Sequence, residues 1–456
     1  MTPQGDQFVW QTLVSHFGPE RVNGIASSRR RFASHLLPDL QAAIVAEVAP
    51  FDAALLGFHQ PYDHEAPTMS GLLLRDGHSV VAIAPLQYQD LDVGEEEPFA
   101  ALKDGLWLFR VQDVPVAILL SRYNDFFSNS QLTQVEIAYV PGDASSAFAR
   151  DFLQRVQAAG EVSRLYRGKV LSFEAGSDYS GMRAEMLVHK LPKVARDDVI
   201  LAEETMARLD QHVFEFDRHR AALKGLGQST RKGILLYGPP GTGKTHVIRY
   251  ISSTLADHTT VLITAEQVTN LTRYMTLART LQPSIVVLED VDLVGRSRDS
   301  MNSPNTEVLL NRLLNEMDGL RADADILFIL TTNRPEDIEE ALASRPGRVD
   351  EAIELPLPDA ACRQRLMALY GRALTFEDGA EADAVALSEG VSAAFMKEMV
   401  RRLAQRALAR DGTAQVRRDD IAAVFGDATS RPSRLNRRIV GIVEQPRKAP
   451  PADECC

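Results

Sequence analysis

Eight consecutive residues constrain the fold of this chain more than any others: Gly238-Pro239-Pro240-Gly241-Thr242-Gly243-Lys244-Thr245. They follow an apolar run, Ile234–Tyr237, and precede a helical pattern over 244–256. Glycines let backbone N–H groups wrap around a phosphate, and the positive end of the following helix adds to the attraction. Lys244 supplies a charge for β- and γ-phosphates, and the Thr245 hydroxyl suits Mg²⁺. The segment therefore predicts a phosphate-binding loop between a strand and a helix.

The pattern around this loop is typical of an α/β fold with a parallel sheet. Apolar runs alternate with helical stretches from about residue 195, and the expected strands are Ile234–Tyr237, Thr260–Thr264, Ile285–Leu288 and Ile326–Thr331. The helices expected between them cover 244–256, 266–281 and 305–317. Strands that are apolar on both faces are expected to lie between helices. After Pro358 the pattern is helical throughout, over 360–374, 381–389, 392–410 and 417–425, which predicts a small helical lid.

The first 190 residues have a different pattern, with helices expected first and short strands after them. The expected helices cover 8–17, 32–48 and 147–159, and the expected strands cover 79–84, 106–111, 114–120, 134–140 and 168–173. This order predicts a separate α+β domain with one layer of strands. His59, His64 and Glu65 lack metal-ligand spacing, so we expect a solvated loop there. The predicted domains are 1–190, 195–357 as the α/β core and 358–427 as the lid, followed by a flexible basic tail, 428–456.

Length and charge limit the remaining possibilities. A chain of 456 residues predicts two to three domains. Its net charge of −12 disfavours general binding to nucleic acid. The sequence has no run of 18 apolar residues, its start lacks a signal-peptide pattern, and two of its three cysteines are Cys455 and Cys456. We therefore expect a cytoplasmic protein without a membrane span, and interpret the two last cysteines as incidental rather than as a lipidation signal.

Polar residues follow two further expected strands and a turn. Glu289 and Asp290 end the strand at 285–288, where open α/β sheets bind ligands. One carboxylate is expected to hold Mg²⁺ and the other to orient an attacking water. Asn333 ends the strand at 326–331, where its amide could reach that water or the γ-phosphate. Arg345 and Arg348 flank a Pro-Gly turn, where arginine can stabilise charge on a transferred phosphoryl group.

Together these elements resemble the AAA clade of the AAA+ ATPases over roughly residues 195–425. The resemblance rests on four motifs: Gly233–Thr245, Leu314–Leu320, Thr331–Pro335 and Arg345–Asp350. It implies an AAA+ fold with ATP and Mg²⁺ as ligands, Lys244 and Thr245 in Walker A, and Glu289 and Asp290 in Walker B. By the same resemblance Asn333 matches sensor 1, and Thr245 and Glu289 are the implied Mg²⁺ residues. Arg345 and Arg348 match arginine fingers that reach a neighbouring subunit, which implies a homo-oligomeric ring, usually a hexamer.

This sequence departs from the family pattern at three places. Walker B normally reads Asp-Glu, whereas this chain has Glu289-Asp290. No glycine occurs between Gly243 and Gly295, so the aromatic–apolar–Gly pore loop of threading members is missing. We interpret Tyr274-Met275, the aromatic pair nearest to that pattern, as a packed helix face. The segment 390–398 resembles the sensor 2 helix but lacks its arginine. No His-Glu-x-x-His occurs, which excludes the metalloprotease branch.

Three classes of function remain open at this point. The leading hypothesis is an ATP-hydrolysing protein-remodelling or assembly ATPase whose N-terminal domain recognises an unknown protein client. The alternative is an assembly scaffold that binds ATP and hydrolyses it slowly because of its Glu-Asp order. A nucleic-acid motor or loader is the third, and the acidic N-terminal domain and the absence of a helix-turn-helix signal weigh against it.

Overall fold

The computed structural model describes residues 8–59, 66–75, 80–125, 130–162, 165–173, 186–264, 267, 271–293, 315–316, 324–336 and 349–430. By its internal contacts the chain divides into Met1–Lys190 and Leu191–Cys456, called unit 1 and unit 2 below. Several predicted features lie outside the described residues, namely Arg345, Arg348, His64, Glu65, most of the helix predicted over 305–317 and the tail from 431. Within the ranges given, no helix is long and apolar enough to cross a membrane.

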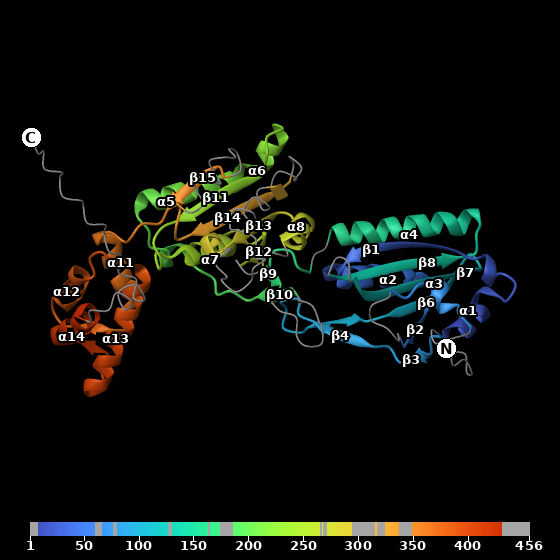
Figure 1. Cartoon of the computed structure of the whole chain (residues 1–456), viewed down its shortest axis with the longest axis horizontal. Helices are drawn as coiled ribbons and strands as arrows, with labels where there is room; N and C mark the ends of the chain where they lie inside the picture. The colour runs from blue at the N-terminus through green and yellow to red at the C-terminus, as the bar shows by residue number, and fades with distance from the viewer. Residues whose placement is uncertain are drawn as a thin grey trace, which may run out of the picture. The chain divides into compact units, whose positions relative to one another are not determined.

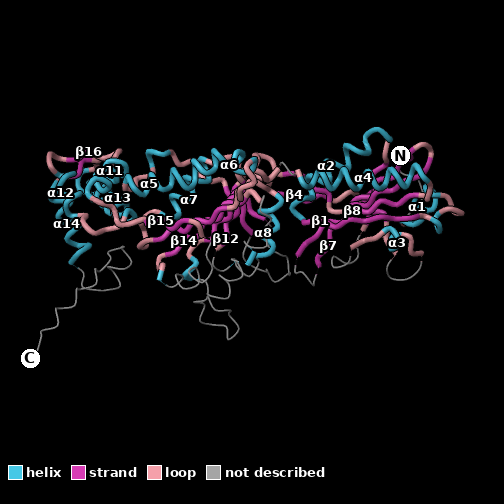
Figure 2. Tube along the Cα trace, turned by 90° about the horizontal axis from the view of Figure 1, so that it is seen from above, coloured by secondary structure: helices cyan, strands magenta, loops and turns pink. Residues whose placement is uncertain are grey.

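Unit 1 contains an antiparallel sheet with the strand order β1-β8-β7-β6-β2-β3. Its strands are β1 (Ala26–Ala33), β2 (Ala54–Phe58), β3 (Ile83–Ala84), β6 (Gly105–Val111), β7 (Val114–Asp125) and β8 (Ser130–Tyr139). Helices α2 (Leu37–Val48) and α4 (Asp143–Glu161) cover one face, and α1 (Val9–Phe17) and α3 (Met69–Leu72) cover the other (Figure 2). Alternate residues of the central strands therefore enter two separate apolar cores.

Short hairpins complete unit 1. Strand β4 (Tyr88–Leu91) pairs with β5 (Phe99–Leu102), and β9 (Val170–Phe173) pairs with β10 (Met186–His189). The helix predicted over 32–48 was wrong at its start, since Phe32 belongs to β1 and α2 begins at Leu37. Strand β1 was not predicted because it contains three consecutive arginines, Arg29 to Arg31. Pairing with β8 outweighs their weak strand propensity, and charged residues are common on edge strands.

Unit 2 contains the predicted parallel sheet. Its strands are β11 (Lys232–Tyr237), β12 (Thr259–Ile263), β13 (Ser284–Leu288), β14 (Ile326–Thr332) and β15 (Glu351–Glu354). They lie in the order β12-β13-β14-β11-β15, and each neighbouring pair is parallel (Figure 1). The α/β class predicted from the sequence is confirmed. Strand β15 was not predicted, because Glu351-Ala-Ile-Glu354 lacks an apolar run.

Helices flank this sheet. Helix α7 (Lys244–Thr254) packs into one apolar core together with residues of α5 (Glu203–Leu209) and of a π-helical turn, Asp210–Glu215. Helix α6 (Phe216–Gly225) continues from that turn, and the sequence pattern did not predict this helical segment. Helix α8 (Leu271–Thr280) buries both Tyr274 and Met275 completely, as predicted for a packed helix face.

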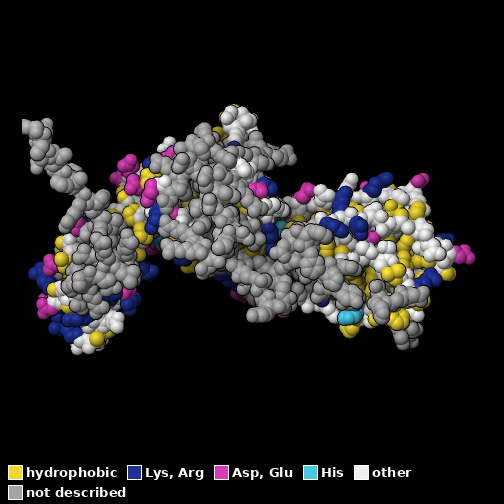
Figure 3. All heavy atoms as spheres, viewed as in Figure 1, with side chains coloured by type: hydrophobic (Ala, Val, Ile, Leu, Met, Phe, Trp, Pro, Cys, Tyr) yellow, Lys and Arg dark blue, Asp and Glu magenta, His cyan; other side chains and the backbone are white. Residues whose placement is uncertain are grey.

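The C-terminal part of unit 2 is a helical lid with its own apolar core. It consists of α11 (Ala360–Tyr370), α12 (Ala380–Leu387), α13 (Ala393–Asp411) and α14 (Arg418–Ser430). Two short strands, β16 (Thr375–Phe376) and β17 (Gln415–Val416), also pair here, although the pattern after Pro358 predicts only helices. Helix α14 continues to Ser430, past its predicted end at 425. Lys and Arg side chains gather over this helical part in Figure 3.

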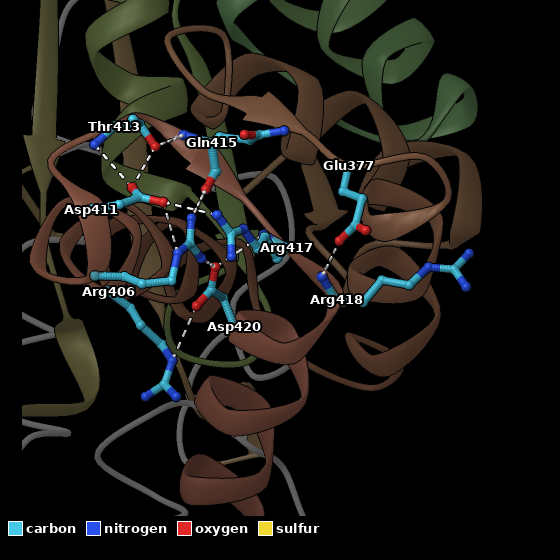
Figure 4. A network of polar contacts seen from close by, with 9 residues as sticks. Glu377, Arg406, Asp411, Thr413, Gln415, Arg417, Arg418 and Asp420 are labelled. Atoms are coloured by element: carbon cyan, nitrogen blue, oxygen red, sulfur yellow. Dashed lines mark hydrogen bonds and ion pairs between the residues drawn. The ribbon is translucent and has the colours of Figure 1, made fainter.

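A buried carboxylate organises the end of this lid. Asp420 is 3% exposed and accepts hydrogen bonds from the guanidinium of Arg410 and the backbone N–H of Arg417, with Arg406 3.3 Å away (Figure 4). Burial alone would raise the pKa of Asp420, but the Arg417 N–H and the Arg410 guanidinium outweigh it and lower the pKa. Nearby, hydrogen bonds from Thr413 and Arg410 lower the pKa of Asp411 to about 2. The lid therefore depends on ionised carboxylates.

Asp420→Ala is expected to destabilise the lid by about 2 kcal/mol, because it removes charge-assisted hydrogen bonds and leaves Arg410 without its buried partner. Hydrogen exchange of the α13 and α14 amides in the full chain measures this loss. Asp419→Ala, at an exposed neighbouring position, is the control. Since the pKa of Asp420 is lowered in the folded state, its contribution is present at neutral pH and is lost as the pH falls below about 4. Equal exchange in both variants would contradict this assignment.

Candidate nucleotide-binding site

Three glycines shape the loop between β11 and α7. Gly238, Gly241 and Gly243 have φ values of 146°, 79° and 104°, a region that other residues rarely adopt. A Cβ atom on Gly238 would lie 2.2 Å from the Leu355 carbonyl oxygen, and one on Gly241 would lie 2.8 Å from Ser392 Oγ. On Gly243 a Cβ atom would meet nothing within 4 Å. The positive φ values therefore favour glycine at all three positions. At Gly238 and Gly241, close packing also leaves no room for a side chain.

Lys244 begins α7 and is 7% exposed. Its ammonium group donates hydrogen bonds to the carbonyl oxygens of Gly238, at 2.8 Å, and Pro239, at 3.0 Å. Burial lowers the pKa of Lys244, and the negative charges of Asp290 and Asp292 oppose this shift. The loop thus holds its lysine close to the carboxylates that follow β13. Thr245, the next residue, is exposed.

The neighbouring strands bring two more predicted groups to the same edge of the sheet. Leu288 of β13 pairs with Leu330 of β14, and Thr332 of β14 pairs with Tyr237 of β11. Because these strands are parallel, the residues that follow each of them lie side by side (Figure 1). The Asn333 amide donates to Asp290 Oδ1 at 3.1 Å. The structure therefore brings Lys244, Asp290 and Asn333 together at this edge of the sheet.

Asp290 has an unusual backbone. Its φ is +50°, in the left-handed region, where aspartate and asparagine occur more often than most other residues. Its N–H group donates to Thr331 Oγ1 at 2.9 Å, and its carbonyl oxygen accepts from the N–H of Leu293 at 2.8 Å. Glu289, just before it, donates its own N–H to the Ile263 carbonyl oxygen at 3.0 Å. The two carboxylates thus leave the strand end with different backbone conformations.

Asp292 is a residue of this site that the sequence reasoning missed. It is 5% exposed, and its Oδ1 accepts two hydrogen bonds, from the Thr332 hydroxyl at 2.9 Å and from the Asn333 N–H at 3.0 Å. Thr332 Oγ1 accepts in turn from the Arg334 N–H at 2.9 Å. The available signal was a third carboxylate in an otherwise apolar turn, Val291–Leu293. That signal does not identify the partners.

A small apolar cavity of about 90 Å³ lies beside the loop. Its lining comes from four separate segments of unit 2, including Ile200, Leu201, Thr242, Pro356, Cys362 and Ala393. The Ala394 N–H donates to the Gly241 carbonyl oxygen at 3.0 Å, which ties the lid to the loop. Burial and the neighbouring carboxylate of Asp359 raise the pKa of the Cys362 thiol to about 11, so the thiol is neutral.

The residues present suit a nucleotide phosphate with Mg²⁺. The loop supplies positive-φ glycines, a helix N-terminus and the Lys244 ammonium group. Mg²⁺ prefers oxygen ligands, and the Thr245 hydroxyl and the carboxylates of Glu289 and Asp290 supply them at one edge of the sheet. Arg345 and Arg348, the predicted arginine fingers, lie outside the described residues.

Comparison with known proteins agrees with this chemistry. Residues 234–357 match the family described as "ATPase family associated with various cellular activities (AAA)". The chain is 34% identical over 211 residues to the proteasome-activating nucleotidase of Methanoregula boonei, covering 44% of this chain and 48% of that protein. It is 32% identical over 219 residues to the ATP-dependent zinc metalloprotease FtsH of Thermus thermophilus, covering 45% and 34%. The resemblance to the AAA clade is confirmed.

A third relative extends the same comparison. The cell division cycle protein 48 homolog of Archaeoglobus fulgidus is 29% identical over 237 residues, which cover 50% of this chain and 32% of that protein. The chain thus spans less than half the length of each of these three curated relatives.

Lys244→Ala is expected to reduce nucleotide binding below detection, because it removes the only ammonium group that the described part of the loop offers to the phosphates. Titration with a fluorescent ATP analogue measures this. Lys232→Ala is the control, since Lys232 is also partly buried but begins β11 at the opposite end of the strand. Unchanged affinity in the Lys244 variant would show that the loop is not the phosphate site.

Proposed function

We propose that the protein hydrolyses ATP as a protein-remodelling or assembly ATPase, in keeping with the match of residues 234–357 to the AAA ATPase family. The observation that carries the proposal is the meeting of Lys244, Asp290 and Asn333 at the carboxyl edge of the sheet, with the Asn333 amide 3.1 Å from Asp290 Oδ1. Lys244 can bind the phosphates, while the Asp290 carboxylate and the Asn333 amide lie where they can orient the attacking water. The names of two relatives, a zinc metalloprotease and a proteasome-activating nucleotidase, indicate work on proteins, which supports a protein client for this chain.

Each residue has a proposed role in hydrolysis. The loop Gly238–Thr245 binds the phosphates, with Lys244 neutralising charge on the β- and γ-phosphates. Thr245 and Glu289 would hold Mg²⁺, which supplies charge neutralisation when bound. Asp290 orients and polarises the water that attacks the γ-phosphate, and Asn333 fixes the Asp290 carboxylate. Because Asp290 accepts from Asn333 through Oδ1, we assign the water-orienting role to its other oxygen, Oδ2.

The oligomeric form is part of the proposal. Asp350 and Gly233 exchange two hydrogen bonds of 2.8 Å each, which anchor the start of β15 beside the start of β11. Asp350 is the last residue of the sequence motif Arg345–Asp350, which matches the arginine-finger motif of the family. On this resemblance we propose that Arg345 and Arg348 act on a neighbouring subunit, and hence that the protein forms a homo-oligomeric ring, with a hexamer as the expected form.

The finer assignments rest on the sequence. We propose that residues 1–190 recognise a protein client, that the lid spans 358–427 and that the protein works in the cytoplasm. The net charge of −12 disfavours binding to nucleic acid. A second candidate function, an ATP-binding scaffold with slow hydrolysis, is favoured by one observation only: the Glu289-Asp290 order places the shorter carboxylate where the family has the longer one.

The Asp290 variants separate these two functions. Asp290→Asn is expected to bind ATP and to lose hydrolysis by at least about 10²-fold, because an amide cannot polarise the water. Asp290→Glu is also expected to lower turnover, since glutamate is less suited to a φ of +50° and its extra methylene moves the carboxylate by roughly 1.5 Å. Phosphate release under saturating ATP measures both. A several-fold gain for Asp290→Glu would favour the scaffold.

Arg345→Ala tests the shared site. This variant is expected to bind ATP normally but to lose turnover by about 10³-fold, the scale typical of arginine fingers. Mixing it with Lys244→Ala subunits should restore part of the activity, because some sites then combine an intact loop with an intact arginine. Lys244→Ala mixed with itself is the control. Failure of mixed rings to recover any activity would contradict a site shared between subunits.

A further inference from the structure

Asp292 stands at the centre of a hydrogen-bonded network between the ends of β13 and β14. One oxygen, Oδ1, accepts from both the Thr332 hydroxyl and the Asn333 N–H. The Asn333 side chain then donates to Asp290. Thr331, which precedes Thr332 in β14, accepts a hydrogen bond from the Asp290 N–H. Thr331, Thr332 and Asn333, at the end of β14, therefore contact Asp290 and Asp292, which follow β13.

From this arrangement we infer that Asp292 is a positioning residue, which holds the Asn333 main chain so that the Asn333 amide meets the Asp290 carboxylate. The inference deepens the proposed function and rests on it. Asp292 itself is buried, and within the described residues its side chain accepts hydrogen bonds from Thr332 and Asn333 rather than from the nucleotide loop. Its effect on hydrolysis is therefore indirect, through Asn333.

The geometry explains why an acceptor is needed at this point. Asn333 follows the last residue of β14, so its N–H group is beyond the sheet's regular ladder. Asp292 Oδ1 takes the place of a strand partner and fixes this N–H at 3.0 Å. A partly buried N–H group without an acceptor is costly, so removal of the Asp292 carboxylate would let the Asn333 backbone move toward another acceptor. The amide that contacts Asp290 would move with it.

The same network reaches the chain beyond Asn333. Thr332 Oγ1 donates to Asp292 and accepts from the Arg334 N–H at 2.9 Å. Thr332 is fully buried, so its hydrogen bond to Asp292 is shielded from water, whereas the bond from the Arg334 N–H is only partly buried. Asp292 thus orders Asn333 directly and Arg334 through one hydroxyl. This division predicts a different result for each variant below.

Two readouts test the inference. The first is hydrogen exchange at single-residue resolution in the full chain without nucleotide, which does not depend on ATPase activity. The second is turnover and nucleotide affinity measured separately. The variants are Asp292→Ala, Asp292→Asn and Thr332→Val. Thr260→Val is the matched control, because Thr260 is a buried threonine of β12 whose hydroxyl has no hydrogen-bond partner within the described residues.

Asp292→Ala is expected to speed exchange of the Asn333 and Arg334 amides while those of Val286 and Val287 in β13 stay protected. Turnover should fall by about 10²-fold, the scale of a misplacement near 1 Å. Nucleotide affinity should stay within about threefold, because the phosphate loop is intact. Asp292→Asn keeps a carbonyl acceptor. Compared with Asp292→Ala, it should restore protection of the Asn333 and Arg334 amides and raise turnover by at least about tenfold.

Thr332→Val removes both hydrogen bonds of the hydroxyl, to Asp292 and from the Arg334 N–H, but leaves the bond from the Asn333 N–H to Asp292. It should therefore expose the Arg334 amide alone and slow turnover by roughly tenfold or less. Thr260→Val should resemble the wild type in both readouts. The inference is overturned if Asp292→Ala leaves Asn333 protected, if Asp292→Asn is as defective as Asp292→Ala, or if lost protection spreads into β13. A wild-type chain without turnover would refute the proposed function, while the exchange pattern would still decide the role of Asp292.

Discussion

Parallel pairing of β13, β14 and β11 is the constraint on which the candidate site depends. The pairs Leu288–Leu330 and Thr332–Tyr237 align the three strand ends, so segments about 45 residues apart in sequence meet at one edge. Leu288, Leu330 and Thr332 are buried, and Tyr237 is half-buried. A slip of one residue would turn every side chain to the opposite face of the sheet. Burial therefore fixes the register, and the register fixes the contact between Asp290 and Asn333.

This edge concentrates charge in a poorly solvated place. Lys244, Asp292 and Thr332 are all less than a tenth exposed, while Asp290 and Asn333 are partly exposed. A buried ammonium group needs acceptors, and Lys244 has two carbonyl oxygens of its own loop as well as the field of Asp290 and Asp292. The buried groups Asp292 and Thr332 thus hold the backbone in place, and the partly exposed side chains of Asp290 and Asn333 remain accessible for the reaction. Such a division between support and reaction is what a preorganised site requires.

The sequence predicts those parts of the molecule whose signal is local. The phosphate loop is a continuous motif, and each buried strand of the α/β core is a continuous apolar run. Strand β1 lacks such a signal because its arginines favour no strand by themselves, and only pairing with β8 makes one. The roles of Asp292 and the cavity near Cys362 depend on distant segments meeting. No pattern within a short window contains that information.

The order Glu289-Asp290 after β13 matches the backbone conformation at these two positions. Glu289 still follows the strand ladder, with its N–H on Ile263, whereas Asp290 turns into the left-handed region. A short side chain is favoured there, because it can form hydrogen bonds close to its own backbone. Asn333 approaches Asp290 Oδ1 to 3.1 Å, and Asp292 holds the Asn333 N–H at 3.0 Å. The length of the carboxylate at 290, the left-handed turn and the support from Asp292 therefore form one matched set. Changing any one of them alters the position of the others.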